Sequence, residues 1–342
     1  NLDEFFEVRA DLHMSAYRNQ DTKGSYNTET FEKVYETARS LVNEQYKLYN
    51  DVLLPRLEKE KIKILSHAQR NQAQKKWVQE FFRREVKPLL VPVGLDPAHP
   101  FPQVANKSLN FIVQLSGKDA FGRSNDIAIV KVPRVLPRVI PLPAKVAGGD
   151  KSFVLLSSVI RAHLSDLFPG REVGQFSQFR VTRNSDLSVD EEDVENLRTA
   201  LRKGLQHRQY GEALRLEVSD SCSEHLSNFL LKQFALPETA LFRAAGPVNL
   251  VRLTQLIDLV SDPALLFPAY QSSFPQQLTQ GASIFARMRQ GDVLIHQPFE
   301  SFDGVLAFLK EAVEDPNVLA IKQTIYRTGS DPAMMNLLRE AV

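Results

Sequence analysis

The sequence predicts a multidomain protein of the α+β class, and three features indicate this. Residues 1–87 carry apolar side chains at helical spacing. Residues 88–273 alternate strand-like and helix-like segments after a stretch rich in proline. The last forty residues combine a helix, an apolar strand-like run and the start of a second helix, which we interpret as a βαβ-type unit cut off partway.

The composition is that of a globular protein that carries no strong overall charge. Of 342 residues, 43% are hydrophobic and 24% are charged. Lys and Arg total 42 against 41 Asp and Glu, so no global field attracts nucleic acid or an anionic membrane. Any anion site must therefore be local, and we expect no nucleic-acid partner. The single cysteine, Cys222, excludes an internal disulfide and fits a reducing compartment.

Residues 1–87 are expected to be all-helical. A capping-type residue and two acids precede Phe5, as at the start of a helix. The apolar stripe of residues 28–61 predicts one long helix or a pair, with Pro55 as a break or kink. A third helix is predicted over residues 69–87.

The predicted domain over residues 88–273 begins with a β-hairpin. Its strands are Leu109–Leu115 and Ile127–Val132, joined by a loop that contains glycine. A helix is then expected over Phe153–Leu167 and a strand over Phe176–Arg183. The remaining predicted elements are a helix at Val189–His207, a strand at Ala213–Val218, and helices at Ser223–Phe234 and Asn249–Leu259.

The last forty residues place a cation where phosphate-binding groups are commonly found. A helix is predicted over Phe302–Val313, a buried strand over Val318–Ile321 that continues through Thr324–Tyr326, and a new helix from about Ala333. Arg327 follows the strand directly. Open α/β sheets bind ligands beyond the carboxyl ends of their strands, and a fixed guanidinium beside a helix N-terminus suits a phosphate oxygen. The pattern therefore predicts a phosphate contact at Arg327.

A second basic residue, Lys322, lies five positions before Arg327 in the same predicted strand. Because strand side chains alternate with a period of two, the two residues point to opposite faces. Arg327 is the better candidate ligand, and Lys322 is expected to face solvent or an internal acid.

Other charged clusters have simpler structural explanations. The acids of Asp190–Asp193 with Glu195 suit the first turn of a helix better than a metal site. Arg83, Arg84 and Lys87 likewise suit a last helical turn better than a phosphate patch.

The histidines and the common sequence motifs give no direct signal for a site. The seven histidines show no metal-ligand spacing and are interpreted as surface or core residues. His296, just before the terminal unit, comes nearest to a ligand contact. No GxGxxG, GxxxxGK[ST] or GxSxG motif occurs, so a Rossmann site, a P-loop and an α/β-hydrolase lack their usual signal.

Six longer segments run through the chain in a consistent order. They are NLDEFFEVR at Asn1–Arg9, DPAHPFPQVANKSLN at Asp96–Asn110, FRVTRNSDLSVDEEDVENL at Phe179–Leu197, YGEALRLEV at Tyr210–Val218, DVLIHQPFESFD at Asp292–Asp303 and VLAIKQTIYRTGSD at Val318–Asp331. Together they resemble the polyphosphate kinase family, in the class that phosphorylates itself on histidine.

The resemblance implies three domains. Residues 1–87 would form a helical N-terminal domain whose beginning is missing, and residues 88–273 a mixed α+β head domain used in dimer contacts. Residues 274–342 would be the truncated first part of a phospholipase D-like α/β domain, so we expect an N-terminal fragment. The implied assembly is a homodimer or tetramer in the cytoplasm, with peripheral membrane association left open.

The resemblance also implies an activity, the reversible transfer of the γ-phosphate of ATP to polyphosphate through a phosphohistidine, with Mg²⁺. By motif match Asn1 takes the position of the ATP-contacting asparagine, and Arg327 that of the arginine at the phosphate–magnesium site. A guanidinium has no lone pair to offer a metal, so Arg327 would act through phosphate oxygens.

The family's catalytic histidines would lie beyond Val342, so no catalytic residue is expected in this chain, and the fragment alone should be inactive. Two alternatives remain, a non-catalytic dimerisation or interaction module and a diverged phospholipase D-type phosphodiesterase.

Overall fold

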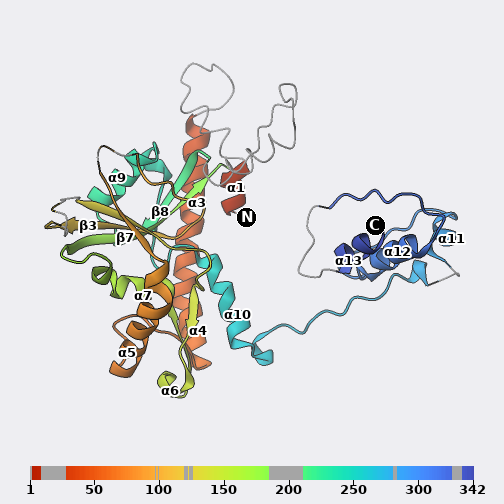
Figure 1. Ribbon diagram of the computed structural model, residues 1–342, viewed down its shortest axis with the longest axis horizontal. Helices are drawn as coiled ribbons and strands as arrows, with labels where there is room; N and C mark the ends of the chain where they lie inside the picture. The colour runs from red at the N-terminus through yellow and green to blue at the C-terminus, as the bar shows by residue number, and fades with distance from the viewer. Residues whose placement is uncertain are drawn as a thin grey trace. The chain divides into compact units, whose positions relative to one another are not determined.

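The structure is a computed structural model that describes residues 2–8, 28–96, 98, 100–118, 122, 126–184, 211–279, 283–325 and 333–342. The chain forms two compact units, Asn1–Ser261 and Asp262–Val342 (Figure 1). Each unit is described by itself. The predicted helix at Val189–His207 lies outside the described residues.

A six-stranded mixed sheet forms the centre of the first unit, in the order β2-β4-β3-β7-β8-β9. Neighbouring strands are antiparallel except β8 and β9, which are parallel. The predicted hairpin is confirmed as β3 and β4, and the strands predicted at Phe176–Arg183 and Ala213–Val218 are confirmed as β7 and β8. The bounds are β2 Val91–Gly94, β3 Asn110–Ser116, β4 Ile127–Lys131, β7 Glu172–Arg183, β8 Ala213–Ser219 and β9 Leu241–Ala244.

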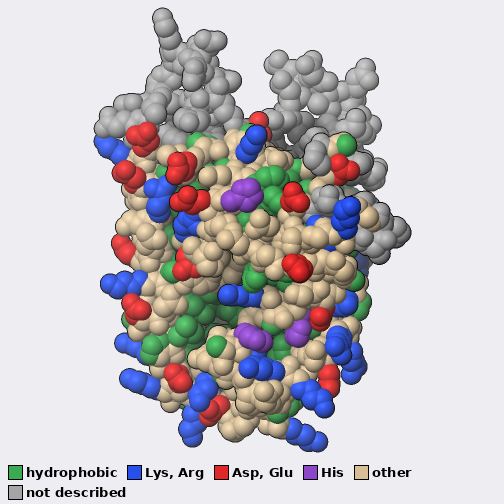
Figure 2. All heavy atoms as spheres, turned by 90° about the vertical axis from the view of Figure 1, so that its left-hand side faces the viewer, with side chains coloured by type: hydrophobic (Ala, Val, Ile, Leu, Met, Phe, Trp, Pro, Cys, Tyr) green, Lys and Arg blue, Asp and Glu red, His purple; other side chains and the backbone are tan. Residues whose placement is uncertain are grey.

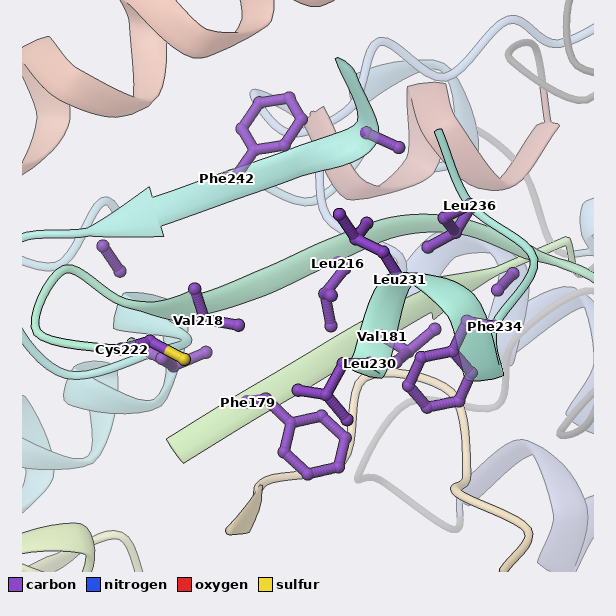
Figure 3. Close-up of a cluster of buried hydrophobic side chains, with 14 of the residues drawn as sticks. Phe179, Val181, Leu216, Val218, Cys222, Leu230, Leu231, Phe234, Leu236 and Phe242 are labelled. Carbon is purple, nitrogen blue, oxygen red and sulfur yellow. The ribbon is translucent and has the colours of Figure 1, made fainter. Parts of the chain in front are cut away.

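Helix α9, Glu224–Gln233, covers one face of β7 and β8, as predicted. Ser223 caps its N-terminus by accepting a hydrogen bond from the backbone N–H of Leu226. Leu230 and neighbouring side chains of α9 point toward Phe179 and Leu216 of the two strands (Figure 3). Burial of these side chains is the main force that attaches the helix to the sheet.

A second apolar cluster packs β3 and β4 against two helices. One is α5, Gln72–Phe81, which continues as a π-helical turn over Phe82–Val86, so the predicted third helix is confirmed. The other is α7, Leu156–Ala162. Because this cluster and the one under α9 lie on opposite faces, β3 is buried on both sides, which explains its continuous apolar run.

A three-stranded sheet, in the order β1-β6-β5, adjoins these elements and corrects two predictions. Its strands are β1 Ile62–Ile64, β5 Val139–Pro141 and β6 Lys151–Leu155. Residues 1–87 are therefore not all-helical, and the helix predicted over Phe153–Leu167 begins only at Leu156. A short apolar run does not distinguish a strand from a buried helix, and pairing of β6 with β1 and β5 decides in favour of a strand here.

The long N-terminal helix runs beside the sheet (Figure 1). It comprises α3, Thr28–Leu48, a π-helical turn at Tyr49–Leu53, and α4, Leu54–Lys59. Pro55 lies in the first turn of α4, where its missing N–H is tolerated, and the wider π turn before it keeps the backbone helical. Pro55 thus marks an irregular turn within a continuous helical run.

The side chains of this helix bind strand β8 and the loop that follows β9. The hydroxyl of Tyr35 donates to the carbonyl of Leu214, and that of Tyr46 donates to Pro247, both at 2.8 Å. Further along, Asn50 donates to the carbonyl of Ala245 at 2.8 Å. A Cβ on Gly246 would lie 3.3 Å from the Tyr46 ring, so glycine permits this close approach. Burial raises the pKa of the neighbouring Tyr49 to about 12.

The second unit is built from short helices. They are α11 Ile284–Met288, α12 Asp303–Glu314 and α13 Ala333–Glu340, so both helices predicted for the last forty residues are confirmed. Glu311 of α12 accepts hydrogen bonds from the backbone N–H groups of Ile284 and Phe285 at the start of α11. Hydrogen bonds from Ser283 and from these N–H groups lower the pKa of the Glu311 carboxyl.

The buried strand predicted over Val318–Ile321 is wrong. These residues and the described part of Thr324–Tyr326 have irregular backbone, and Leu319 is 98% exposed. A strand needs a neighbour to satisfy its backbone groups and cover its side chains. Among the described residues of this unit the one β-type pairing is an isolated bridge between Ser273 and Glu300, so no partner strand is present.

Within the described parts of the chain, no helix has the length and apolar character needed to cross a membrane.

Core packing predicts a large effect for Leu216→Ala. Leu216 is fully buried between β7 and α9, so the loss of its side chain should lower the free energy of unfolding by about 2–5 kcal/mol. Urea denaturation measures this. Leu41→Ala, at a position 53% exposed on α3, is the matched control and should change stability by less than about 0.5 kcal/mol. Equal effects would contradict the described core.

Candidate functional site

Helix α1, Leu2–Val8, is attached to the sheet through a buried ion-pair network. Arg180 of β7 donates from Nη1 to Asp3 Oδ2 at 3.0 Å and from Nη2 to Asp3 Oδ1 at 3.1 Å. Arg215 of β8 also pairs with the Asp3 carboxylate. Glu217 accepts from Arg180 Nε at 2.6 Å and from Arg215 Nη2 at 3.1 Å. Two carboxylates and two guanidiniums therefore balance within one cluster.

Strand alternation explains why these side chains meet. Arg215 and Glu217 are two residues apart in β8 and so share one face, opposite Leu214 and Leu216. In the antiparallel register Arg180 pairs with Glu217, which places the opposite charges side by side. This face meets α1 and the other meets α9, so the charged residues select where the first helix docks.

Apolar contacts reinforce the network. Phe6, on the same helix as Asp3, is fully buried and packs edge-on against Tyr35 at 5.2 Å and Phe242 at 6.0 Å between ring centroids. The Arg215 guanidinium lies 4.8 Å from the centroid of Phe6 and 5.3 Å from that of Phe242. Cation–π attraction at such desolvated positions adds about 2 kcal/mol. The first helix is thus held by charge and by packing together.

The electrostatics of the network favour the ionised forms. Burial opposes the charge on Asp3, but the charges of Arg180 and Arg215 outweigh it, and the pKa of Asp3 lies below its usual value. Burial also opposes the charge on Arg180, yet Glu217 and Asp3 outweigh it and raise its pKa above the ordinary arginine value. Asp3 and Arg180 therefore carry their charges at neutral pH.

A large groove of about 1250 Å³ opens elsewhere in the first unit. It is bordered by α4, β1, the start of α7 and the ends of β7 and β8. Its lining mixes apolar side chains with serines, amides and charges of both signs. Lys63, His67 and Arg161 are the basic residues, and Glu58 and Asp220 the acidic ones. Such a surface can bind a ligand through hydrogen bonds and apolar contacts together.

The residues predicted for the site are placed as follows. Asn1 and Arg327 both lie outside the described residues, as does the acidic run Asp190–Glu195. His296 is exposed, with its ring 4.9 Å from that of Phe299 and its backbone N–H bonded to Glu300. Lys322 is exposed, in agreement with its predicted solvent-facing role, and Arg83 and Arg84 are exposed as well.

The residues that sequence reasoning missed are Arg180, Arg215 and Glu217. A signal for them was available, because charged residues occupy alternate positions of otherwise apolar strands, as in FRVTR and LRLEV. Buried charges in a strand require partners, and the strand period already places Arg215 and Glu217 on one face. The partner on α1 was not visible in the sequence.

Comparisons with known proteins decide the family. The family model for the polyphosphate kinase middle domain matches residues 73–256, more than half of the chain. The models for the N-terminal domain and for C-terminal domain 1 match residues 1–65 and 283–342. The chain belongs to the polyphosphate kinase family. The resemblance inferred from the six sequence segments is thus confirmed.

Curated relatives agree over the full chain. It is 49% identical over 348 residues to a polyphosphate kinase of Neisseria meningitidis serogroup A and 47% identical over 345 residues to one of Pseudomonas aeruginosa. Each alignment covers 100% of this chain and 50% of the relative, so the chain spans about half the length of these relatives. A crystal structure of polyphosphate kinase from Porphyromonas gingivalis superposes with a TM-score of 0.72 at 24% identity, covering 100% of this chain and 48% of that one, which supports the fold.

No cluster of three or more His, Cys, Asp or Glu side chains suited to a metal ion occurs among the described residues. The described part of the chain therefore does not by itself form a ligand set for Mg²⁺, which prefers several oxygen ligands.

The ion-pair network predicts that Glu217→Gln is strongly destabilising. The variant leaves the buried Arg180 and Arg215 with one carboxylate in place of two, which should cost about 3–5 kcal/mol. Chemical denaturation followed by circular dichroism measures the difference. Glu36→Gln, an exposed position on α3, is the control, and an equal effect of both variants would show that the network is not structural.

The lowered pKa of Asp3 predicts acid sensitivity. A carboxyl whose pKa is lower in the folded state stabilises the fold above its unfolded value and loses this contribution as the pH falls through the folded value. The stability difference between the wild-type chain and Asp3→Asn should stay constant above about pH 5 and shrink below it. Denaturation curves at several pH values test this, with Asp51→Asn on an exposed helical position as control. A difference that does not depend on pH would exclude the ionised role of Asp3.

Proposed function

We propose that this chain forms part of an ATP:polyphosphate phosphotransferase, which reversibly transfers the γ-phosphate of ATP to a polyphosphate chain. Matches to three polyphosphate kinase domain models along the chain support this, as do relatives near 48% identity that carry the name.

For this part of the enzyme, the main structural support for the proposal is the docking of α1 on the six-stranded sheet. Asn1 immediately precedes this helix and matches the family's ATP-contacting asparagine. Because Asp3 and Phe6 fix the helix to the sheet, they fix the direction in which the chain reaches Asn1. In our proposal the network therefore positions one polar contact to the nucleotide.

Arg327 supplies the second contact in this proposal. Its planar guanidinium would hold oxygens of the transferred phosphate, and Mg²⁺ would enter with ATP as part of the substrate, bound through phosphate oxygens. The nucleophile is a histidine outside this chain. Its imidazole nitrogen attacks the γ-phosphorus, the bond to the ADP oxygen breaks, and a terminal oxygen of polyphosphate then displaces the histidine.

We further propose that residues 88–273 serve as a head domain that assembles a homodimer or tetramer. We also propose a cytoplasmic location, which fits the one cysteine of the sequence, Cys222, a buried free thiol. Peripheral association with a membrane is compatible with that location. Light scattering on the purified chain measures the assembly.

ATP titration tests the proposed contacts. Arg327→Ala removes a charge-assisted hydrogen bond and should weaken ATP binding by about tenfold or more, and Asn1→Ala should weaken it by a smaller factor. Lys322→Ala, an exposed basic residue five positions away, is the control and should bind ATP as the wild type does. Isothermal titration calorimetry gives the three affinities.

Incubation with γ-labelled ATP should leave no label on this chain, because its nucleophile is absent. A stable phosphoprotein would contradict that assignment. Assembly into dimers without measurable ATP affinity would instead favour a non-catalytic interaction module.

A further inference from the structure

A buried arginine in the first unit has donors without partners. Arg70, in the loop before α5, is only 3% exposed. Its Nη2 donates to the carbonyl of Leu65 at 3.4 Å and to the hydroxyl of Ser158. Its Nε and Nη1 are buried and have no hydrogen-bond partner. Burial lowers the pKa of Arg70 to about 10, which still leaves it charged at neutral pH.

Burying the Arg70 charge costs free energy unless an acceptor completes its hydrogen bonds. A buried charge normally has an opposite charge or a full set of hydrogen bonds. Among the described residues no carboxylate forms an ion pair with Arg70, in contrast to Arg180 and Arg215, which share Asp3 and Glu217. Two donors of the Arg70 guanidinium, Nε and Nη1, therefore lack an acceptor.

The surroundings of Arg70 are basic. Its side chain lines a cavity of about 270 Å³ together with His67, Lys75, Lys76 and His163, and no carboxylate takes part in the lining. The other lining residues are Gln72, Val78 and Gln79. Figure 2 shows one face of the molecule on which histidine side chains lie beside Lys and Arg side chains. Three cationic side chains, Arg70, Lys75 and Lys76, and no lining carboxylate favour a compact anion.

The adjoining helix adds to this potential. α5 has ten residues and begins beside the cavity, with Asn71 as its N-cap and Gln74 completing a capping box. The N-terminal end of a helix dipole is positive and stabilises nearby negative charge. Lys75 and Lys76, in its second turn, project ammonium groups that can adjust to the bound group.

The two histidines respond to the same field. Burial and then the charges of Arg70, Lys75 and Arg161 lower the pKa of His67. Burial also lowers the pKa of His163, where Asp166 opposes the shift and His67, Arg70 and Arg83 add to it. The His163 ring stacks on Phe82 with 4.8 Å between centroids, which fixes its place at the cavity. An anion between these groups would reverse both shifts.

We propose that this cavity binds a phosphate-type oxyanion, with the Arg70 guanidinium as its fixed ligand and Lys75 and Lys76 as adjustable ones. A tetrahedral anion carrying more than one charge matches the paired donors and the several cations better than a single carboxylate does. The ligand is either free inorganic phosphate or a phosphate unit of a longer chain. The cavity shares His67 with the 1250 Å³ groove, so a longer chain could extend into that groove.

The site lies within the first unit and does not depend on Asn1 or Arg327. Its test can therefore fail while the proposed phosphotransferase function stands.

Titration of the full 342-residue chain with inorganic phosphate at constant ionic strength tests the proposal. NMR of the imidazole groups should show that phosphate raises the pKa of His67 and His163. The double variant K75Q/K76Q should weaken phosphate binding at least tenfold, and R70Q should abolish it. Lys87→Gln, an exposed lysine after the same helix, is the charge-matched control and should bind as the wild type does.

The double lysine variant keeps the test decisive if R70Q fails to fold, because Lys75 and Lys76 make no described contact in the core. Repeating the titration with tripolyphosphate identifies the source of the ligand. Binding at least tenfold tighter than phosphate indicates a chain, and equal binding indicates free phosphate. Absence of phosphate binding, or equal weakening by Lys87→Gln and the double variant, would overturn the proposal.

Discussion

The ion-pair cluster of Asp3, Arg180, Arg215 and Glu217 is the constraint on which the arrangement of the first unit depends. It joins a helix at the start of the chain to strands about two hundred residues later. A buried pair of this kind contributes little stability compared with an apolar replacement, but breaking it is expensive. Its effect is therefore specificity: α1 can dock at one place on the sheet, because only there do both carboxylates meet both guanidiniums.

The apolar core explains why the cluster can be tolerated. Phe6, Tyr35 and Phe242 exclude water from the Arg215 side, and the cation–π contacts replace part of the lost hydration. The opposite face of β8 carries Leu214, Leu216 and Val218, which pack under α9 and hold the strands in register. One face of β8 carries charged residues and meets α1, and the other is apolar and meets α9. These two faces together specify the register of β8 in the sheet.

Local patterns in the sequence were sufficient for elements whose partners lie nearby or whose pattern is long. The hairpin of β3 and β4, helix α9 and helix α12 follow from periodicity and turn residues alone. The end of strand β6 fits the start of a helix equally well in the sequence, because its three apolar residues, Phe153 to Leu155, are compatible with both periods. The run around Leu319 shows the converse error, since a strand-like composition forms no strand without a neighbour to pair with.

The candidate site divides in the same way. Motif matches propose Asn1 and Arg327, because such matches rest on local strings of residues, whereas Arg180 and Glu217 acquire their role only from strand register. Arg70 was not predicted at all, since nothing near it in the sequence marks it as buried.

The comparison of these arginines separates a structural cation from a candidate ligand. Arg180 and Arg215 are buried and form ion pairs with carboxylates of the same chain, so their charges are compensated within the fold. Arg70 is equally buried and lies among further cations, but among the described residues no carboxylate pairs with it. Folding does not account for such a group, because its desolvation remains uncompensated within the described protein. An anion bound from solution would accept hydrogen bonds from Arg70 and offset the positive charge around the cavity. It is therefore the simplest explanation for a buried, unpaired guanidinium at this position.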